Sequence, residues 1–375
     1  MKEIPLSVPH LNGNEWEYIK ECLDTNWVSS AGKYVDKFEN NLAEYIGSKN
    51  DVATVNGTAA IHTALKILGV EAGDTVLVPA LTFIATVNPV AYCGAKPVFV
   101  DSELDTYNMD PAKLEAKIVK LIDKDQKPKA VIVVHLYGQP AKIKEIAEVC
   151  DKYDVYLIED ATESLGLKYK DQMTGTFGDI GCFSFNGNKL ITTGGGGMLV
   201  TDNDQWAEKA RYLTTQAKDD AVQFIHHEVG YNYRLTNIQA AMGVAQLEQI
   251  DAFIVKKREI NDFYYENLNS IEGITVTREL DDSYSNYWLS TMLVDENKFG
   301  VDSKKLYKRL RSEGIMVRPF FKPINEMPMY SNNNFNGENT QKLWEEGICL
   351  PSSVNLKQDE LIHIITSIKE IKFKG

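Results

Sequence analysis

The chain has 375 residues, of which 43% are hydrophobic and 25% are charged, a composition typical of folded globular proteins. This balance excludes a disordered chain, a collagen-like repeat and a disulfide scaffold. The formal net charge of −13 argues against nucleic acid and anionic membranes as partners, although a local anion site is compatible with it.

Cysteine usage and the N-terminal sequence indicate a compartment. The five cysteines are odd in number, widely spaced and without a CxxC pair, which is typical of reduced thiols in a cytoplasm. The first ten residues, MKEIPLSVPH, lack the apolar stretch of a signal peptide. No run approaches the roughly 20 apolar residues of a membrane helix. We therefore expect a soluble, cytoplasmic protein.

Helical and strand patterns alternate over the first 250 residues. Apolar residues recur at helical spacing in 35–46, 59–68 and 141–153, and short apolar runs occupy 75–80, 97–101, 130–138, 155–160 and 181–186. Several of these runs consist almost entirely of Val, Ile and Leu, as strands do when both faces of their sheet are covered. The pattern predicts an α/β fold with a mostly parallel central sheet.

The pattern changes after about residue 245. A long helical stretch, 244–268, precedes expected strands at 274–277 and 287–294, and helices at 303–314 and 358–372 follow. The polar stretch 331–340 is predicted to be a surface loop. We predict a large domain of residues 1–250 and a smaller C-terminal α+β domain of residues 251–375.

Asp160 and Lys189 are the main candidates for chemistry. Asp160 ends an apolar strand, and ligand groups in open α/β sheets project from the carboxyl ends of strands. Lys189 follows another strand, in a loop of small and neutral residues, and a lysine there can form a Schiff base with a carbonyl. A carboxylate facing a pyridine nitrogen is the electronic partner of pyridoxal phosphate (PLP). The alternatives are a helix cap or ion pair for Asp160 and a solvated surface position for Lys189.

A phosphate cradle is the third candidate feature. Gly57, Thr58 and Ala59 begin an expected helix, whose free amides and positive dipole end attract anions. The same position suits Thr58 as a simple N-cap, so both interpretations stay open. For the glycine run Gly194–Gly197, a tight turn into the following strand is favoured over direct phosphate contact.

The order of seven motifs makes the signal specific. NGTAAIH, LTFIAT, IEDATES, SFNGNK, GGGGML, GYNYRLTNIQAAMG and VRPFF follow one another over essentially the whole chain. In this order they resemble the DegT/DnrJ/EryC1/StrS family of PLP-dependent sugar aminotransferases. The resemblance implies a PLP-transferase type I fold, like that of aspartate aminotransferase, and a homodimer with shared active sites.

The resemblance also implies roles for individual residues. Lys189 would bind the cofactor covalently and later move a proton, Asp160 would pair with the pyridinium nitrogen, and Phe83 would stack on the ring. Glu163 stands where the family often has His or Gln near the cofactor. The phosphate would contact Gly57, Thr58, Ala59 and Ser184, with Asn232 reaching it from the neighbouring subunit and Arg234 beside Asn232 in a structural or anion-facing role.

Two motifs bear on the substrate. The lysine loop, NGNK followed by TTGGGG, resembles the subgroup acting on UDP-linked 4-keto-6-deoxy-N-acetylhexosamines of the bacillosamine and legionaminic acid routes. The stretch RPFFKPINEMPMY resembles perosamine synthases, which use a GDP-linked 4-keto-6-deoxymannose. We expect C4 transamination of the UDP-linked sugar with glutamate as donor, in surface glycan biosynthesis, and the GDP-linked sugar is the alternative.

Candidate substrate contacts are weaker. Arg318 and Lys322 are candidates for the diphosphate, or else an ordinary surface pair, and Tyr330, Trp288, His226 and His227 are candidate walls of the nucleotide pocket. The adjacent histidines lack the spaced third ligand of a zinc site, so no metal is expected. Two rival functions are a C3 dehydration, in which family members usually replace the lysine by His, and a non-catalytic regulator. Lys189 argues against the dehydration, and the presence of both Asp160 and Lys189 argues against the non-catalytic regulator.

Overall fold

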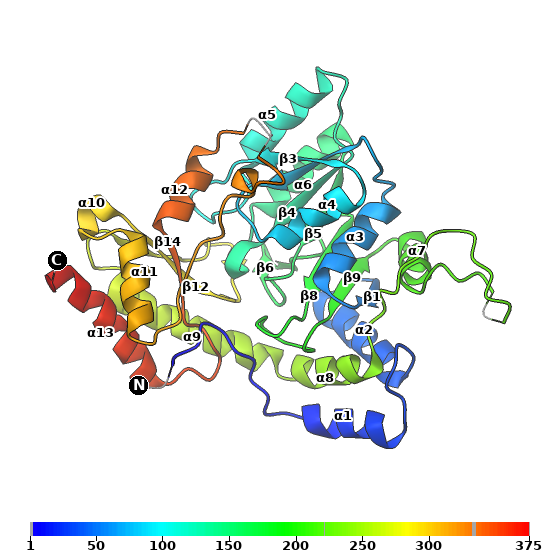
Figure 1. Cartoon of the computed structure of the whole chain (residues 1–375), viewed down its shortest axis with the longest axis horizontal. Helices are drawn as coiled ribbons and strands as arrows, with labels where there is room; N and C mark the ends of the chain where they lie inside the picture. The colour runs from blue at the N-terminus through cyan, green and yellow to red at the C-terminus, as the bar shows by residue number, and fades with distance from the viewer. Residues whose placement is uncertain (1–2, 221, 332–334, 375) are drawn as a thin grey trace.

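A computed structural model describes residues 3–220, 222–331 and 335–374. Its largest sheet has seven strands in the order β1-β9-β8-β5-β4-β2-β3 (Figure 1). Only β9 runs antiparallel to its neighbours, which confirms a mostly parallel central sheet. The strands are β1 (Asn50–Thr54), β2 (Thr75–Pro79), β3 (Lys96–Val100), β4 (Ala130–Val134), β5 (Tyr156–Asp160), β8 (Ile180–Ser184) and β9 (Gly197–Thr201).

Helices cover both faces of this sheet, which is why every residue of β4 and β9 is buried. One face packs against α3 (Gly57–Ile67), α4 (Asn88–Tyr92) and α7 (Asp204–Thr214). The other packs against α2 (Lys33–Ile46), α5 (Pro111–Ile122), α6 (Ile143–Tyr153) and α8 (Asn237–Leu247), and α1 (Glu15–Asp24) lies on the outside of α8. The result is a three-layer α/β arrangement, as the sequence predicts.

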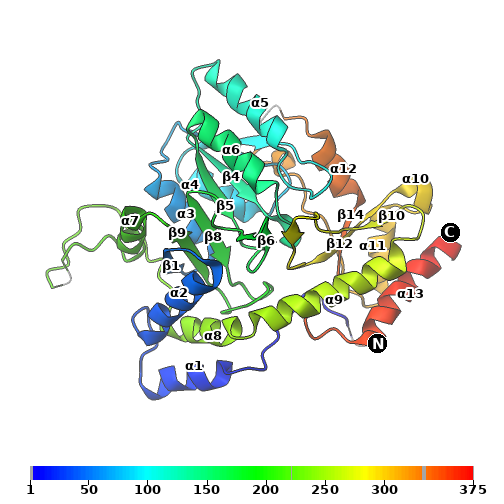
Figure 2. The ribbon, with the colours of Figure 1, turned by 180° about the vertical axis from the view of Figure 1, so that it is seen from behind.

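The later part of the chain forms a second sheet, with strand order β10-β12-β14-β13 and antiparallel pairing throughout. Figure 2 shows α9 (Ile250–Leu268) running along it beside α13 (Gln358–Lys374). Ile4, near the start of the chain, joins the core of this region. The division into two domains at residue 250 stays a prediction.

The remaining elements complete this region and a small third sheet. The second sheet and its surroundings contain β10 (Ile274–Val276), β12 (Ser290–Val294), β13 (Arg318–Pro319), β14 (Gly347–Leu350), α10 (Glu296–Phe299), α11 (Ser303–Ser312) and α12 (Glu338–Glu346). The small sheet contains β6 (Lys168–Tyr169), β7 (Gln172–Met173) and β11 (Ser283–Tyr284).

The predicted long helix over 244–268 is two helices. The first, α8, ends at Leu247, and α9 begins at Ile250, with Gln249 outside helical geometry between them. The side-chain amides of Gln246 and Gln249 both donate to the carboxylate of Glu15, the first residue of α1. The start of α1 therefore contacts the residues on both sides of the break. Both helices bury apolar residues at similar spacing, and the sequence pattern therefore continues across a break that it does not show.

Two expected strands are shorter than the apolar runs that predicted them. Residues 130–138 form a strand only to Val134, and the next residues turn, with Tyr137 and Gly138 at positive φ of 56° and 85°. Residues 287–294 form a strand only from Ser290. A Cβ on Gly138 would lie 2.6 Å from the Trp288 nitrogen. A glycine is therefore needed where these two segments meet.

Other features follow the residues closely. The glycine run is a turn into β9, with Gly194 and Gly196 at positive φ. Of the polar stretch 331–340, residues 332–334 lie outside the described residues and 338–340 begin α12. All five cysteines are free and buried. Among the described residues, no helix is both long and apolar enough to cross a membrane.

Candidate active site

A cavity of about 420 Å³ lies at the carboxyl edge of the large sheet. Its walls come from the first turn of α3, the loop after β2, the ends of β5 and β8, and the loop that holds Lys189. Trp288, Arg318 and Phe321 close it from the later part of the chain. The carboxyl edge is where the parallel topology brings residues from distant segments together.

Asp160, the last residue of β5, is buried against the cavity. Its Oδ2 accepts a hydrogen bond from the Thr86 hydroxyl (2.6 Å), and its Oδ1 accepts one from the Thr162 amide (3.2 Å). Both oxygens of this buried carboxylate therefore have a donor within the chain, and their orientation is fixed. The arrangement presents a negative group to a cationic nitrogen bound in the cavity.

Lys189 lines the same cavity, with its side chain 14% exposed. Its Nζ is 3.3 Å from Glu163 Oε1 and 4.0 Å from the centre of the Trp288 ring. An ion pair on one side and an aromatic face on the other hold the amine at the cavity.

Glu163 is the partner of Lys189 and is buried. Its Oε2 accepts a hydrogen bond from the Tyr137 amide (2.7 Å). Burial raises the pKa of this carboxyl group, and the nearby Asp160 adds to that effect, while Lys189 and the Tyr137 amide oppose it. A carboxyl group with a raised pKa beside an amine is suited to exchange a proton with it.

The first turn of α3 forms an anion cradle. Asn56, and not Thr58, is the N-cap, since its side chain accepts a hydrogen bond from the Ala59 amide (2.8 Å). Within the described part of the chain, the amides of Gly57 and Thr58 have no acceptor. A Cβ on Gly57 would lie 2.9 Å from the Ser184 Cβ, so only glycine lets the helix start approach β8 this closely. Two free amides beside two hydroxyl side chains suit a phosphate group.

These residues fit PLP, which carries a ring nitrogen, an aldehyde and a phosphate group. A carboxylate, an amine and an anion cradle line one cavity of suitable volume. When bound, the cofactor supplies an electron-accepting ring and an aldehyde through which an amino group is exchanged. Phe83 and Phe321, whose ring centres are 5.6 Å apart, add an aromatic wall.

Several residues predicted from the sequence lie outside this cavity. Asn232 is exposed after α7, and His226 and His227 belong to the exposed segment before it, where His227 Nδ1 is 2.9 Å from Asp219. Lys322 pairs with Glu326 (3.4 Å). The Tyr330 hydroxyl donates to Asn88 and its ring packs in the core of the large sheet region. Arg234 binds Glu39 and the Ala53 carbonyl within the chain, a structural role.

The sequence reasoning missed three contacts. Thr86 holds Asp160, the Tyr137 amide holds Glu163, and the Trp288 ring covers Lys189 itself rather than only the pocket wall. The signal for Thr86 was present in LTFIAT, one turn beyond Phe83. The contacts of Tyr137 and Trp288 depend on turns that no local sequence pattern predicts.

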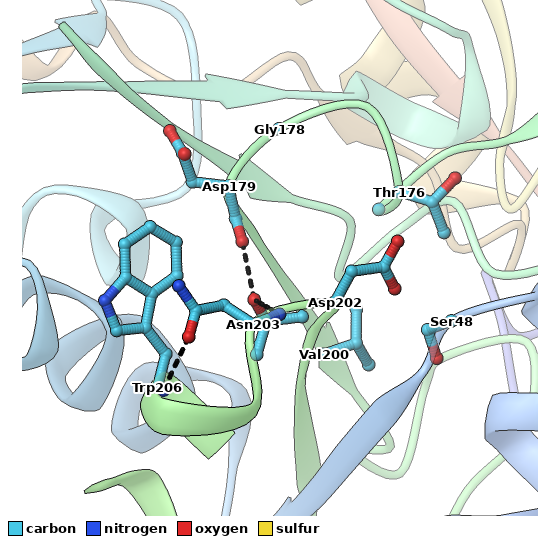
Figure 3. Close-up of a pocket in the computed structure, with 10 residues that line it drawn as sticks. Ser48, Thr176, Gly178, Asp179, Val200, Asp202, Asn203 and Trp206 are labelled. Atoms are coloured by element: carbon cyan, nitrogen blue, oxygen red, sulfur yellow. Dashed lines mark hydrogen bonds between the residues drawn. The ribbon is translucent and has the colours of Figure 1, made fainter. Parts of the chain in front are cut away.

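A second cavity of about 420 Å³ lies at the other end of the strands, between the start of β8 and the end of β9 (Figure 3). Its polar groups already serve the fold. Asp179 accepts a hydrogen bond from the Leu157 amide (2.8 Å), and Asn203 caps α7. None of the described residues that line it carries an amine or a guanidinium group, so it offers no counterpart to Lys189.

The fold and the site together define the class of protein, the PLP-dependent transferases of type I, aspartate aminotransferase-like fold. Within that class, this chain belongs to the DegT/DnrJ/EryC1/StrS aminotransferase family, whose family model matches residues 9–369. It is a PLP-dependent sugar aminotransferase.

Individual relatives match over nearly their whole length. EpsN of Bacillus subtilis, provisionally named a pyridoxal phosphate-dependent aminotransferase, is 44% identical over 99% of this chain and 98% of its own. GDP-perosamine synthase of Escherichia coli O157:H7 is 43% identical over 99% of both chains. The structure of PseC of Helicobacter pylori, an aminotransferase involved in pseudoaminic acid biosynthesis, superimposes with a TM-score of 0.93 at 25% identity, covering 100% of both chains.

Proposed function

We propose that this enzyme transfers an amino group from glutamate to the C4 ketone of a nucleotide-linked 4-keto-6-deoxy sugar, in surface glycan biosynthesis. The observation that carries the proposal is the placement of Asp160, Lys189 and the α3 cradle on one cavity. The names of the relatives, which act on or make amino sugars, support the substrate class.

In this proposal each residue has a task. Lys189 holds the cofactor and then, as a free amine, moves a proton between donor and acceptor carbons as general acid and base. Asp160, held by Thr86, keeps the ring nitrogen protonated. Gly57, Thr58 and Ser184 bind the phosphate group. Ala59, whose amide is already bound by Asn56, shapes the cradle from behind.

For the nucleotide, we propose UDP, with a 2-acetamido-2,6-dideoxy-4-keto hexose as the sugar. The support is the lysine loop around Lys189, which lies next to the reacting carbon and resembles the UDP-sugar subgroup. The GDP-linked 4-keto-6-deoxymannose is the second candidate, and the 43% identity to a GDP-perosamine synthase favours it. In either case Arg318, which lines the cavity, is positioned for a substrate oxygen or phosphate.

The test is a direct competition. Purified enzyme with PLP and glutamate is incubated with equal amounts of the two nucleotide sugars, and mass spectrometry identifies the amino sugar formed. We expect the UDP-linked product to exceed the GDP-linked product by at least about tenfold. A preference for the GDP-linked sugar would reject the nucleotide assignment, and no amino sugar from either would reject the substrate class.

We also propose a homodimer with shared active sites. Residues 216–220 and 222–230, called the arm, extend from the body between α7 and α8 (Figure 1). The arm exposes apolar side chains, with Val222 85% and Phe224 67% exposed. Exposed apolar groups of this kind are typical of an interface. Asn232 follows the arm, is exposed and does not line the cavity of its own chain, as expected of a residue that serves the neighbouring cavity.

Mixing two inactive variants tests the shared site. A mixed dimer of Lys189→Ala and Asn232→Ala subunits contains one cavity with both Lys189 and a partner-supplied Asn232. We expect the mixture, after dissociation and reassociation, to recover about a quarter of wild-type activity, because half of the dimers are mixed and each has one intact site. No recovery, with mixed dimers shown by native mass spectrometry, would contradict the sharing of Asn232.

A further inference from the structure

The segment Ser285–Leu289, called the connector, is buried between the small sheet and the cavity. Asn286 Nδ2 donates to the carbonyls of Glu163 (3.1 Å) and Leu165 (2.9 Å), and the Leu289 amide donates to the Tyr137 carbonyl (3.2 Å). The connector is therefore attached to the loops after β4 and β5, which hold the partner of Lys189. Its position determines how those loops and the cavity fit together.

Trp288 is the connector residue that contacts Lys189. Its ring centre is 4.0 Å from the Lys189 Nζ, and its Nε1 donates to the Asn188 carbonyl (2.7 Å). One side chain thus contacts both the amine and the backbone that precedes it. A small rotation of the indole would change both contacts at once, so the orientation of Trp288 matters for the placement of the amine.

Lys257 on α9 holds the connector from the other side. The residue is 2% exposed, and its Nζ donates to the carbonyls of Trp288 (2.8 Å) and Ser352 (2.7 Å). No ion pair joins it to a carboxylate among the described residues, and burial lowers the pKa of Lys257 to about 7. Burying an amine without a counter-ion is unfavourable, and a methionine of similar length would avoid it. We infer that lysine stands here because its amine donates hydrogen bonds to these two carbonyls.

We propose that Lys257 is a positioning residue for the aminotransferase reaction, acting through Trp288 on Lys189. By fixing the Trp288 carbonyl it keeps the indole over the Lys189 amine. By binding the Ser352 carbonyl at the same time, it links that placement to α9 and to the loop after β14. This inference rests on the proposed role of Lys189 in holding the cofactor.

The test compares Lys257→Met with a matched control on the same helix. Lys256→Met removes the neighbouring lysine on α9, which is exposed and pairs with Glu259 (2.9 Å). The rate at which apoenzyme takes up PLP is followed by absorbance, well below the unfolding temperature of each variant. We expect Lys257→Met to slow uptake and lower kcat by about tenfold with KM for glutamate nearly unchanged, and Lys256→Met to match wild type.

A double-mutant cycle separates positioning from general stability. If Lys257 acts through Trp288, the variant with both Lys257→Met and Trp288→Leu takes up PLP no more slowly than Trp288→Leu alone. Multiplied effects, about a hundredfold together, would overturn the proposal. If Lys257→Met does not fold, PLP uptake is measured with Trp288→Leu and Trp288→Phe instead. Wild-type uptake by Trp288→Leu would show that the indole does not place the Lys189 amine, and this result would also overturn the proposal.

One further readout distinguishes the two proposals. Borohydride reduction of the PLP-loaded enzyme fixes the cofactor on its lysine, and peptide mass spectrometry locates it. A label on a peptide without Lys189 would contradict the proposed function. A label on Lys189 together with multiplied effects in the cycle would contradict only the role of Lys257.

Discussion

The cavity at the sheet edge and the arm after α7 differ in how their side chains are satisfied. In the cavity, Asp160, Glu163 and Lys189 are buried or nearly so, and each has a polar partner in the same chain. In the arm, Val222 and Phe224 expose apolar surface to solvent. Asn232, which directly follows the arm, is nonetheless a residue that the sequence motifs assign to the same kind of active site as the cavity residues.

This difference separates two kinds of functional residue. Polar groups at a reacting centre need fixed partners before substrate arrives, because orienting them during the reaction raises the barrier. Apolar groups on a protruding segment are stabilised only when another surface covers them. The contrast is what a site with its chemistry in one subunit and part of its wall in another would produce.

The largest expected effect is in the cavity. Lys189→Ala removes the proposed acid–base group, and we expect kcat to fall by at least about 10³-fold, with loss of covalent PLP binding. Steady-state assays and the cofactor absorbance measure the two losses. Lys170→Ala, at an exposed lysine paired with Glu145, is the control and should keep both properties. Retained covalent PLP in Lys189→Ala would show that another lysine holds the cofactor.

The arm gives the next effect. The double substitution Phe224→Ser and Val229→Ser removes exposed apolar side chains. We expect the proposed dimer to dissociate about 30-fold more readily, which corresponds to a loss of about 2 kcal/mol of binding free energy. Sedimentation velocity measures the dissociation constant. Ile362→Ser, at an exposed apolar residue of α13, is the matched control. Equal association of both variants would remove the arm from the interface.

Thr86 tests how far fixed orientation matters in the cavity. Thr86→Val keeps the shape but removes the hydroxyl that donates to Asp160, and we expect kcat to fall by about tenfold, corresponding to about 1.4 kcal/mol. Thr214→Val, which removes a buried hydroxyl bonded to the Ala210 carbonyl of its own helix, is the control. If the two substitutions lower kcat equally, the hydrogen bond to Asp160 has no special role.

The smallest effect concerns Asp51, a buried carboxylate outside both regions. Its Oδ2 has no hydrogen-bond partner, and burial raises its pKa to about 7, above the unfolded value. A raised folded pKa gives stability that is full below about pH 4 and is lost as pH rises through 7. Asp51→Asn should therefore raise the free energy of unfolding by about 1–2 kcal/mol at pH 8, and less at pH 5. Denaturant unfolding at both pH values measures it, and an equal change at both would contradict the titration of Asp51.

The sequence by itself determined the α/β order, the parallel sheet and the cavity centre. Unbroken apolar runs are stable only when both faces of a sheet are covered, so the layer arrangement follows from local pattern. Parallel strands place their carboxyl ends at one edge, where Asp160 ends one strand and Lys189 follows another. The family and its cofactor followed from the order of the motifs.

Only the tertiary structure decided which groups hold those residues. The break between α8 and α9 and the turn at Tyr137 depend on segments far apart in the chain. Lys257 and Trp288 lie in stretches whose sequence predicts an ordinary helix and strand. They are connected to Lys189 because buried polar groups form hydrogen bonds with whatever partners the fold places beside them. No local sequence pattern predicts which partners these are.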